Sequence, residues 1–340
     1  MNYLTPYDLQ RTNEEDMMKA IVQDRYGTAD VLELRDITKP VVGDDDVLVE
    51  IEAAGVDPGV WHLMTGLPYL VRVMGYGLRQ PKNGVRGRDL AGRVEAVGKN
   101  VTGFQPGDEV FGTCEGSFAE YAIAREDKLA LKPPNLSFEQ AAVVPISGMT
   151  ALQAVRDKGH VKPGDQVLII GAGGGVGSFA VQMAKALGAE VTGVCSTAKV
   201  DLVRSLGADH VIDYTRGDFV EGDRRYDLII DNAGNRSLAQ LRRALSAVGT
   251  LVIVGGEGGG NWVGPADRLL PAFLLSPFVG QKLGMLTSVE RQQDLVTLGE
   301  MLESGVITPV IDRSYPLVEA PDAIRYVGEG HARGKVVVNI

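Results

Sequence analysis

The feature that most constrains the fold of this chain is a glycine-rich run at residues 171–177, with the sequence Gly-Ala-Gly-Gly-Gly-Val-Gly. It follows an apolar segment, 166–170, and precedes a segment with helical periodicity, 177–187. Glycines between a strand and a helix let the backbone come close to an anion at the unpaired first amides of the helix. Because the spacing is G-x-x-G-x-x-G rather than G-x-G-x-x-G, a flexible turn before a helix is the alternative interpretation.

The segments around this run alternate between strand and helix patterns. The expected strands span 166–170, 190–194, 210–212, 227–231 and 250–254, and the expected helices span 177–187, 199–206 and 237–245. Such alternation with short connections predicts a parallel sheet covered by helices on both faces. We therefore expect an α/β Rossmann unit with a doubly wound parallel sheet.

The chain before this unit has a different pattern, with short β-rich runs and frequent glycines. The expected strands span 20–22, 47–51, 91–97 and 118–123, and a final strand at 335–340 returns to them. These runs predict an antiparallel or barrel-like β domain. The predicted division is a flexible leader at 1–17, the β domain at 18–137, the nucleotide-binding domain at 138–304 and the return to the β domain at 305–340.

Composition excludes several classes of protein. A net charge of -10 disfavours nucleic acid or an anionic membrane as a main partner. Two cysteines, Cys114 and Cys195, are too few for a disulfide framework or a thiolate zinc cage, which predicts a cytoplasmic location. The apolar window 269–286 contains prolines and a lysine, so we expect buried core or a subunit contact there. An edge strand in that window predicts a homodimer.

The end of the second expected strand indicates the cofactor. A carboxylate at that point would bind a ribose hydroxyl and favour NAD, but the sequence continues as Cys195-Ser196-Thr197-Ala198-Lys199. Hydroxyls and an ammonium can hold a 2′-phosphate, so NADPH is predicted. As alternatives, Ser196 or Thr197 caps the next helix and Lys199 is a solvated surface charge. Tyr214 stacks near the adenine or lies on the rim.

Several further segments, together with the glycine run, resemble the medium-chain dehydrogenase/reductase superfamily, in its zinc-free quinone oxidoreductase branch. That branch includes the relatives of the mitochondrial reticulon-interacting oxidoreductase. The segments are 57–64, 87–94, 101–110, 144–152 and 331–335. The resemblance covers residues 19–340. It implies a GroES-like β-barrel catalytic domain, interrupted in sequence by the Rossmann domain, with the active site between them.

The resemblance also implies site residues. Cofactor contacts are expected from Gly173, Gly174, Gly175, Val176, Ser196, Lys199 and Tyr214. Positions near the nicotinamide or phosphate parts are expected for Thr150, Gly255, Gly256, Arg333 and Lys335.

The resemblance argues against a metal. Zinc-dependent members of the superfamily carry a cysteine in the loop at 56–59 and Gly-His-Glu at the position of Gly87-Arg88-Asp89. Both ligands are missing from this sequence, and His62 alone cannot supply the three ligands of a catalytic zinc. We therefore expect no metal.

Without a Lewis acid, the easier reaction is hydride addition to an electron-poor acceptor, such as a quinone or an α,β-unsaturated carbonyl compound. The candidate catalytic residues are Asp57, Trp61, His62 and Thr150. His62 is equally interpretable as a packed core imidazole. Tyr69 and Tyr76 lie in a segment, 66–79, that either folds over the pocket or forms loop surface.

Two other functions stay open at this point. One is zinc-independent reduction of an aldehyde or ketone, which gives an alcohol with the alkene intact. The other is a protein that binds NADPH as a sensor or scaffold with little turnover, which the lack of an evident acid–base residue permits.

Overall fold

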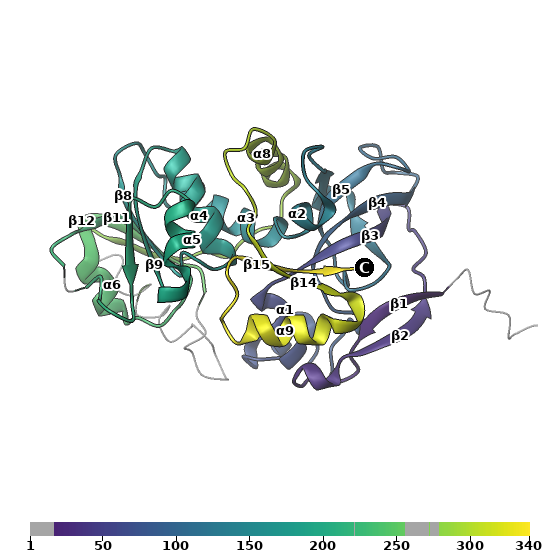
Figure 1. Cartoon of the computed structure of the whole chain (residues 1–340). Helices are drawn as coiled ribbons and strands as arrows, with labels where there is room; N and C mark the ends of the chain where they lie inside the picture. The colour runs from purple at the N-terminus through teal and green to yellow at the C-terminus, as the bar shows by residue number, and fades with distance from the viewer. Residues whose placement is uncertain (1–16, 221, 256–271, 273–278) are drawn as a thin grey trace, which may run out of the picture.

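The computed structural model describes residues 17–220, 222–255, 272 and 279–340. Two β-sheets, one toward each end of the molecule, contain most of its strands, and helices α2 and α3 lie between them (Figure 1). In the part of the chain that is described, no helix is long and apolar enough to cross a bilayer.

The six-stranded sheet is wholly parallel, in the order β10-β9-β8-β11-β12-β13. Its strands are β8 (Gln166–Ile170), β9 (Glu190–Cys195), β10 (His210–Asp213), β11 (Tyr226–Asp231), β12 (Leu245–Ile253) and β13 (Lys282–Met285). Strand β12 begins earlier than the predicted residue 250, because Leu245 pairs with Tyr226 before a register shift. Strand β13 lies inside the apolar window 269–286 and is the terminal strand of the sheet, as expected.

Successive residues of the central strand β8 face different helices, as a doubly wound sheet requires. Val167 and Ile169 share a core cluster with Phe179 of α4. Leu168 and Ile170 share another cluster with Leu241 of α6. The helices of this part are α3 (Pro145–Leu152), α4 (Gly175–Ala186), α5 (Val200–Ser205), α6 (Leu238–Ala244) and α8 (Gln292–Glu303).

Three predicted helix starts differ from the structure by one or two residues. Helix α4 begins at Gly175 rather than at 177, since Gly174 already occupies the N-cap position in an extended conformation. Residues Thr197–Lys199 form a 3₁₀ turn, so α5 begins one residue later than predicted. Helix α6 begins at Leu238, one residue after its predicted start, because Ser237 is the N-cap and forms a reciprocal capping box with Gln240.

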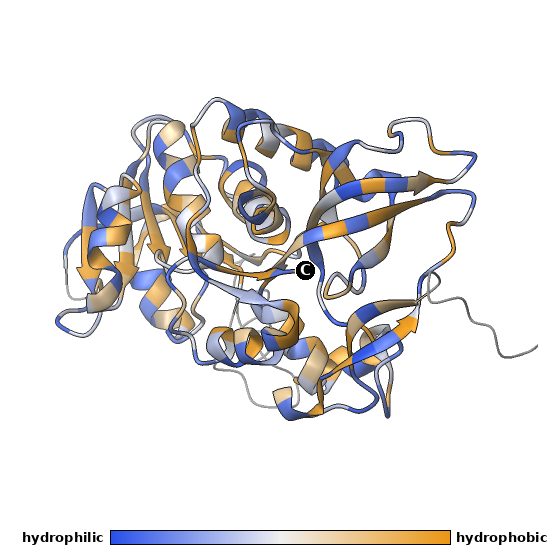
Figure 2. Cartoon of the chain, turned by 45° about the vertical axis from the view of Figure 1, so that its right-hand side comes forward, coloured by the Kyte–Doolittle hydropathy of each residue, from blue (hydrophilic) through white to orange (hydrophobic). Residues whose placement is uncertain are grey.

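The other large sheet has seven strands, in the order β14-β15-β3-β4-β5-β7, with β6 paired to β3. They are β3 (Asp46–Val56), β4 (Asp89–Val97), β5 (Glu109–Thr113), β6 (Tyr121–Arg125), β7 (Leu129–Leu131), β14 (Ile311–Pro316) and β15 (Lys335–Asn339). All its pairs are antiparallel except β14–β15. Figure 2 shows hydrophobic residues along its strands and hydrophilic residues at the outer turns.

One strand prediction in this region was wrong. The segment 118–123 was expected to be a strand, but β6 begins only at Tyr121. Phe118 is fully buried, its amide donates to Arg86 O (2.8 Å) and its carbonyl accepts from Ile21 N (2.8 Å), so it joins other segments instead of the β6 ladder. Strands β1 (Met17–Val22) and β2 (Glu33–Thr38) form a separate antiparallel pair, and β1 starts at the last residue of the predicted leader.

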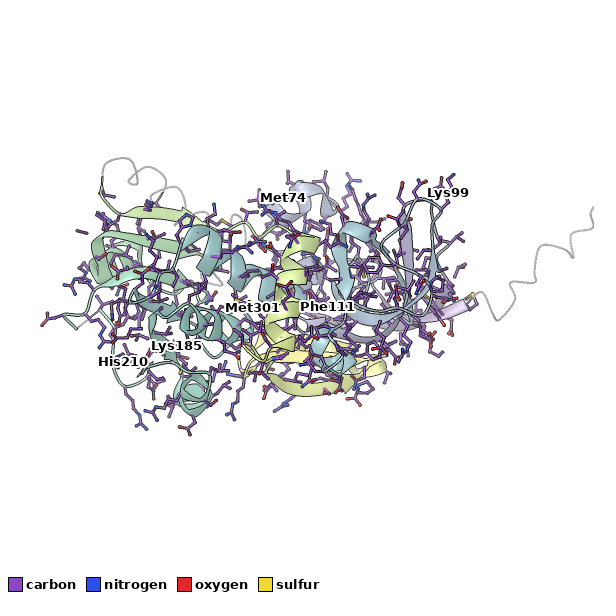
Figure 3. The ribbon with its side chains drawn as sticks, turned by 90° about the horizontal axis from the view of Figure 1, so that it is seen from above. Met74, Lys99, Phe111, Lys185, His210 and Met301 are labelled. Carbon is purple, nitrogen blue, oxygen red and sulfur yellow. The ribbon has the colours of Figure 1, made fainter. Side chains whose placement is uncertain are left out.

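The two large sheets share one hydrophobic core. Phe111 of β5 and Val337 of β15 belong to the same buried cluster as Ile169 of β8, and α2 (Phe138–Ala142) and α3 contribute to it. Met301 of α8, labelled in Figure 3, packs against this cluster. A second cluster joins α1 (Pro58–Thr65) to α9 (Ala320–Gly328). Packed side chains therefore join the two large sheets directly.

Candidate active site

The glycine run forms a tight loop between β8 and α4. Gly171 has a φ of 78°, a conformation that favours glycine. The amides of Gly171 and Ala172 both donate to Val194 O at 3.0 Å, which ties the loop to the end of β9. A Cβ at Gly177 would collide with the carbonyl oxygen of Gly171. Helix α4 begins at Gly175, and no side chain caps its start. Its first amides are therefore suited to bind a phosphate.

The carboxyl-terminal segment of the chain closes one side of this loop. Gly334 N donates to Gly173 O at 3.0 Å, and Gly174 and Gly334 form an isolated parallel bridge. A Cβ at Gly173 would lie 2.9 Å from the Cβ of Lys199, so this cradle accepts only glycine without a shift. Three predicted cofactor residues, Gly173, Gly174 and Gly175, lie at this point, and Val176 follows in the first turn of α4.

Two cations lie together beside the loop. Lys199 Nζ donates to Ala332 O at 2.6 Å and to Gly330 O at 3.3 Å, which places the ammonium beneath the segment that carries Arg333. Burial lowers the pKa of Lys199, and the nearby charge of Arg333 lowers it further. Arg333 N donates to Asp312 Oδ2 at 2.9 Å, which fixes the segment from the other side. Lys199 is therefore held in place and is not a freely solvated surface charge.

The end of β9 presents hydroxyls, as the sequence predicted, but one is already engaged. Ser196 precedes the 3₁₀ turn and makes no capping bond with its side chain. Thr197 Oγ1 donates to Asp213 Oδ2 at 2.6 Å, so a carboxylate from the neighbouring strand β10 stands close to this point. Tyr214 follows it, half exposed, with its amide donating to Cys195 O at 3.1 Å. Ser196 and Tyr214 thus flank the carboxyl ends of adjacent strands.

Asn232 and Gly255 lie just beyond the carboxyl ends of β11 and β12. Gly255 N donates to Asp231 O at 3.3 Å, and a Cβ at Gly255 would lie 2.7 Å from Asn232 O. Asn232 Nδ2 donates to Ile170 O at 3.0 Å, while its buried Oδ1 accepts no hydrogen bond from the described residues. Asn232 Oδ1 can therefore accept a hydrogen bond from a ligand that binds beside the ends of β8 and β11. The predicted site residue Gly256 lies outside the described residues.

A buried ion pair connects the glycine loop to the β-barrel part. Lys335 Nζ lies 3.4 Å from Asp89 Oδ2 and donates to Ser147 Oγ at 3.1 Å, and Asp89 Oδ1 accepts from Ile146 N at 2.9 Å. Asp89 is fully buried, and this burial raises its pKa to about 7 against the opposing effect of Lys335. A Cβ at Gly175 would lie 3.0 Å from Lys335 Cδ. The predicted cofactor residue Lys335 thus reaches the loop, but its ammonium faces Asp89.

Of the four candidate catalytic residues, three lie on α1 or at its N-cap, namely Asp57, Trp61 and His62, and Thr150 lies on α3. Asp57 caps α1 by accepting from Gly59 N at 2.7 Å, and its buried Oδ2 has no hydrogen-bond partner in the described part. Trp61 packs edge-on against His62 at 5.2 Å between ring centroids and touches Gly328 of α9. The negative charge of Asp57 contributes to raising the pKa of the buried Asp89.

His62 and Thr150 make local bonds. His62 Nδ1 pairs with Leu67 O at 2.8 Å, and Thr150 Oγ1 donates to Ile146 O at 2.7 Å within α3. These bonds, and the contact of Trp61 with α9, hold the three side chains in place.

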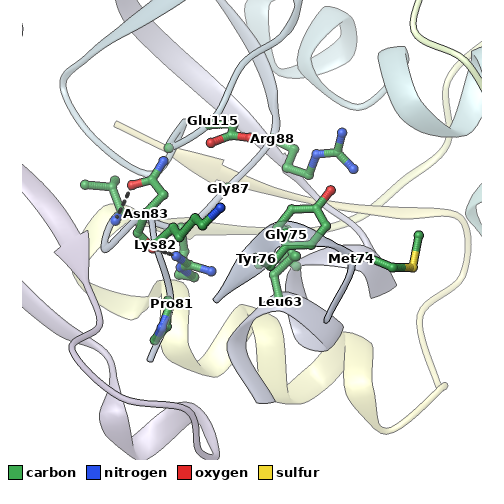
Figure 4. Close-up of a pocket in the computed structure, with 14 residues that line it drawn as sticks. Leu63, Met74, Gly75, Tyr76, Pro81, Lys82, Asn83, Gly87, Arg88 and Glu115 are labelled. Atoms are coloured by element: carbon green, nitrogen blue, oxygen red, sulfur yellow. Dashed lines mark hydrogen bonds between the residues drawn. The ribbon is translucent and has the colours of Figure 1, made fainter. Parts of the chain in front are cut away.

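A cavity of about 380 Å³ opens beside α1 and the loop before β4 (Figure 4). Figure 4 shows Tyr76, Leu63 and Met74 on one side and Lys82 with Asn83 on the other. Tyr76 thus lines the cavity, whereas Tyr69 does not and instead lies under Arg72. The lining is Val60, Leu63, Met74, Gly75, Tyr76, Pro81, Lys82, Asn83, Val85, Arg86, Gly87, Arg88, Glu115 and Gly116.

Arg88 joins this cavity to the nucleotide-binding part. Its guanidinium forms an ion pair with Glu290, which precedes α8. Glu290 Oε2 also accepts from Thr113 Oγ1 at 2.9 Å, and its carbonyl accepts from Lys128 Nζ at 2.7 Å. The segment before α8 is therefore tied to the inner wall of the cavity.

Comparison with known proteins identifies the relatives of this chain. Residues 43–134 match the family model of the alcohol dehydrogenase GroES-like domain, and residues 206–338 match a model described as zinc-binding dehydrogenase. The mouse NAD(P)H oxidoreductase RTN4IP1, mitochondrial, is 33% identical over 354 residues, covering 95% of this chain and 89% of the mouse protein. The chain belongs to the medium-chain dehydrogenase/reductase superfamily, in its quinone oxidoreductase branch.

Two more members of the superfamily show its range. The 2-methylene-furan-3-one reductase of Solanum lycopersicum is 34% identical, with 95% of this chain and 79% of that protein covered. The structure of Escherichia coli quinone oxidoreductase complexed with NADPH matches with a TM-score of 0.83 at 26% identity, over 95% of this chain and 100% of that chain. This chain, like them, is an oxidoreductase with a GroES-like domain and a Rossmann-like sheet.

The positions at which the resemblance leads us to expect zinc ligands in zinc-dependent members hold other side chains in this chain. Arg88 stands at the expected histidine and is paired with Glu290, while Asp57 stands in the loop of the expected cysteine. Among the described residues, no group of three His, Cys, Asp or Glu side chains is arranged to hold a metal ion.

Sequence reasoning missed four residues at this quinone oxidoreductase-like site. Asp213 could have been found, because a carboxylate that ends one parallel strand lies beside the end of the next. Asn232 follows β11 in the same way. Glu290 gave no local signal, since its partner Arg88 lies 202 positions away. Arg86 gave no local signal either.

Proposed function

We propose that this chain is an NADPH-dependent, zinc-independent reductase that transfers hydride to a quinone or an α,β-unsaturated carbonyl compound. The observation that carries the proposal is the glycine loop with Lys199 and Arg333 held beside it, where the end of β9 presents Ser196 instead of a carboxylate. An uncapped helix start with two adjacent cations suits a phosphorylated dinucleotide. The mouse relative is named for NAD(P)H and the Escherichia coli structure contains NADPH.

The residues of the chain would divide the work as follows. The first amides of α4 bind the pyrophosphate, and Lys199, Arg333 and Ser196 bind the 2′-phosphate. Asn232 Oδ1 accepts from the bound cofactor. When bound, NADPH supplies the hydride.

On the acceptor side, Arg88 and Tyr76 line the cavity and can donate hydrogen bonds to an acceptor oxygen as negative charge develops on it. The ion pair with Glu290 fixes the direction in which the Arg88 guanidinium points. A proton then returns from the Tyr76 phenol or from water. The chain therefore acts mainly by orienting and by electrostatic stabilisation.

The acceptor class follows from the missing metal ligands and from the relatives. With arginine at the expected histidine position, a simple ketone would lack a Lewis acid to polarise it. Quinones and enones are electron-poor without one. The tomato relative is named a reductase of a methylene-furanone, and the Escherichia coli protein a quinone oxidoreductase.

The assembly and location of the protein stay predictions. Strand β13 ends the parallel sheet in the described part of the chain, and pairing this edge across a two-fold axis would complete its hydrogen bonds. A homodimer is therefore expected, and sedimentation or light scattering measures it. The low cysteine count supports a cytoplasmic protein.

The test is turnover with purified, chelator-dialysed protein. NADPH oxidation is followed with a quinone, an enone, an alkenal and a saturated ketone, each also with NADH. We expect turnover of the electron-poor acceptors, a preference for NADPH and no change after metal removal. Turnover of the saturated ketone alone would indicate a carbonyl reductase, and tight NADPH binding without any turnover would indicate a sensor or scaffold. Loss of activity on dialysis, restored by zinc, would overturn the metal-free mechanism.

A further inference from the structure

The cavity beside α1 carries an excess of positive charge in a chain whose net charge is -10. Three cations line it, Lys82, Arg86 and Arg88, against one carboxylate, Glu115. Arg88 is paired with Glu290. The described residues supply neither Lys82 nor Arg86 with an ion-pair partner, because no carboxylate oxygen lies within 4.0 Å of either cation.

Arg86 is the unusual member of this set. It is 5% exposed, its Nη2 donates to Asn83 O, and its buried Nε has no hydrogen-bond partner among the described residues. Burial lowers its pKa to about 10, so the guanidinium is still charged at neutral pH. A buried cation with an unsatisfied donor is costly unless an anion accompanies it.

The backbone holds Arg86 firmly in this position. Its amide donates to Ile21 O at 3.2 Å, and its carbonyl accepts from Phe118 N at 2.8 Å. Phe118 and Ile21 are fully buried. The side chain is therefore presented to the cavity from a fixed frame, and a planar carboxylate could pair with it through two parallel hydrogen bonds.

The remaining wall of the cavity is largely apolar. Val60, Leu63, Val85 and Met74 line it, and Met74 is 69% exposed at its edge. A ligand that fits this wall has an apolar body and an anionic end. Such a ligand leaves the Arg88 side of the cavity for its reacting carbonyl group.

We propose that the acceptor is an α,β-unsaturated carbonyl compound that carries a carboxylate, and that Arg86, assisted by Lys82, binds this carboxylate. This inference rests on the proposed function, because it assigns the acceptor of the same site. Arg86 is a specificity-determining residue that does not contact the reacting carbons.

The test compares an enone that carries a carboxylate at the end of an alkyl chain with its methyl ester, so that the reacting double bond is the same. With the unsubstituted protein and saturating NADPH, we expect kcat/KM to be about 10-fold or more higher for the acid, mainly through KM. In Arg86→Gln this acid-to-ester ratio falls to about one. Arg86→Lys keeps part of the preference, and Lys82→Gln lowers it less than Arg86→Gln does.

Arg25→Gln is the matched control, since Arg25 is an exposed arginine nearby that does not line the cavity. It should keep the full preference for the acid. An unsubstituted protein that turns over both compounds equally, or an unchanged ratio in Arg86→Gln, overturns the inference while leaving the reductase proposal intact.

Failure of the reductase proposal gives a different result, namely no turnover of either compound. Binding then decides the inference. The saturated analogue of the acid should raise the melting temperature of the unsubstituted protein more than its ester does, and Arg86→Gln should abolish this difference. Equal shifts for acid and ester would overturn the inference.

Discussion

The glycine loop and the cavity beside α1 are two parts of one candidate active site, and they are built from different kinds of segments. The loop comes from consecutive residues between β8 and α4, and its close contacts leave no room for a Cβ at Gly177. The cavity is assembled from α1, the segment that carries Tyr76, the loop before β4 and the turn at Glu115. From this contrast we expect cofactor binding to depend mainly on backbone shape and acceptor choice to depend on a few charged side chains.

The largest expected effect breaks the backbone cradle. Gly177→Val should weaken NADPH binding by about 100-fold or more, because the added side chain collides with Gly171 O and shifts the loop. Gly284→Ala is the control, since a Cβ there meets nothing within 4 Å. Calorimetric titration with NADPH measures both. Equal affinities for the two variants would show that the loop does not form the cofactor site.

The next prediction concerns the ion pair that joins the two regions. The pKa of Asp89 is raised to about 7 in the folded protein, so folding favours its protonated form. Its contribution to stability is full below the unfolded pKa of about 4 and is lost as pH rises through about 7. Asp89→Asn leaves Lys335 buried without a carboxylate, but it removes this pH dependence. We call the difference in free energy of unfolding between the unsubstituted protein and the variant the stability deficit. This deficit should shrink by roughly 2 kcal/mol between pH 5.5 and pH 8, because only the unsubstituted protein loses stability over this range.

Urea unfolding of both proteins at the two pH values measures this change. Asp201→Asn is the control, because the Asp201 side chain is 96% exposed, and its deficit should not vary. A deficit of Asp89→Asn that stays the same at the two pH values would contradict this and would mean that the Asp89 carboxylate is ionised throughout this range.

A third substitution separates charge from shape within the cofactor region. Lys199→Ala should raise the dissociation constant of NADPH about 10-fold and leave that of NADH within about threefold, as expected for one lost charge–phosphate contact. The exposed Lys162→Ala serves as the control. If NADPH affinity stays unchanged in Lys199→Ala while NADH binds equally well, Lys199 does not bind a 2′-phosphate.

The smallest effect is expected on the acceptor side. Tyr76→Phe should lower kcat/KM for an enone by about threefold, the effect of one partly solvated hydrogen bond, without altering NADPH affinity. Tyr69→Phe is the matched control from the same segment, because Tyr69 does not line the cavity. Steady-state kinetics with both variants compares them. A larger loss in Tyr69→Phe than in Tyr76→Phe would contradict the assignment of the cavity.

The glycine loop is built from consecutive residues and the cavity from distant segments, and this difference decides how much of each could be predicted from the sequence. Strand β8 and the loop after it were predicted closely, because apolar periodicity and glycine spacing are local signals. The carboxyl-end rule for parallel sheets placed Ser196 correctly at the end of β9, and its role in binding stays a prediction. Gly256 lies outside the described residues.

The cavity could not be predicted in the same way. The four candidate catalytic residues came from segments near the site, but their orientation depends on helix packing. Helix α1 turns Val60 and Leu63 to the cavity, while Trp61 packs against α9. Arg88 meets Glu290 and Lys335 meets Asp89 across separations of 202 and 246 positions. Such pairs leave no pattern in a single sequence.

The most direct test of the central claim is the fate of the hydride. NADPH deuterated at the transferred position is incubated with the protein and a simple enone, and the product is analysed by mass spectrometry and NMR. We predict a saturated ketone with one deuterium on the former β-carbon and an intact carbonyl group. An unsaturated alcohol with deuterium on the carbonyl carbon would contradict the proposal.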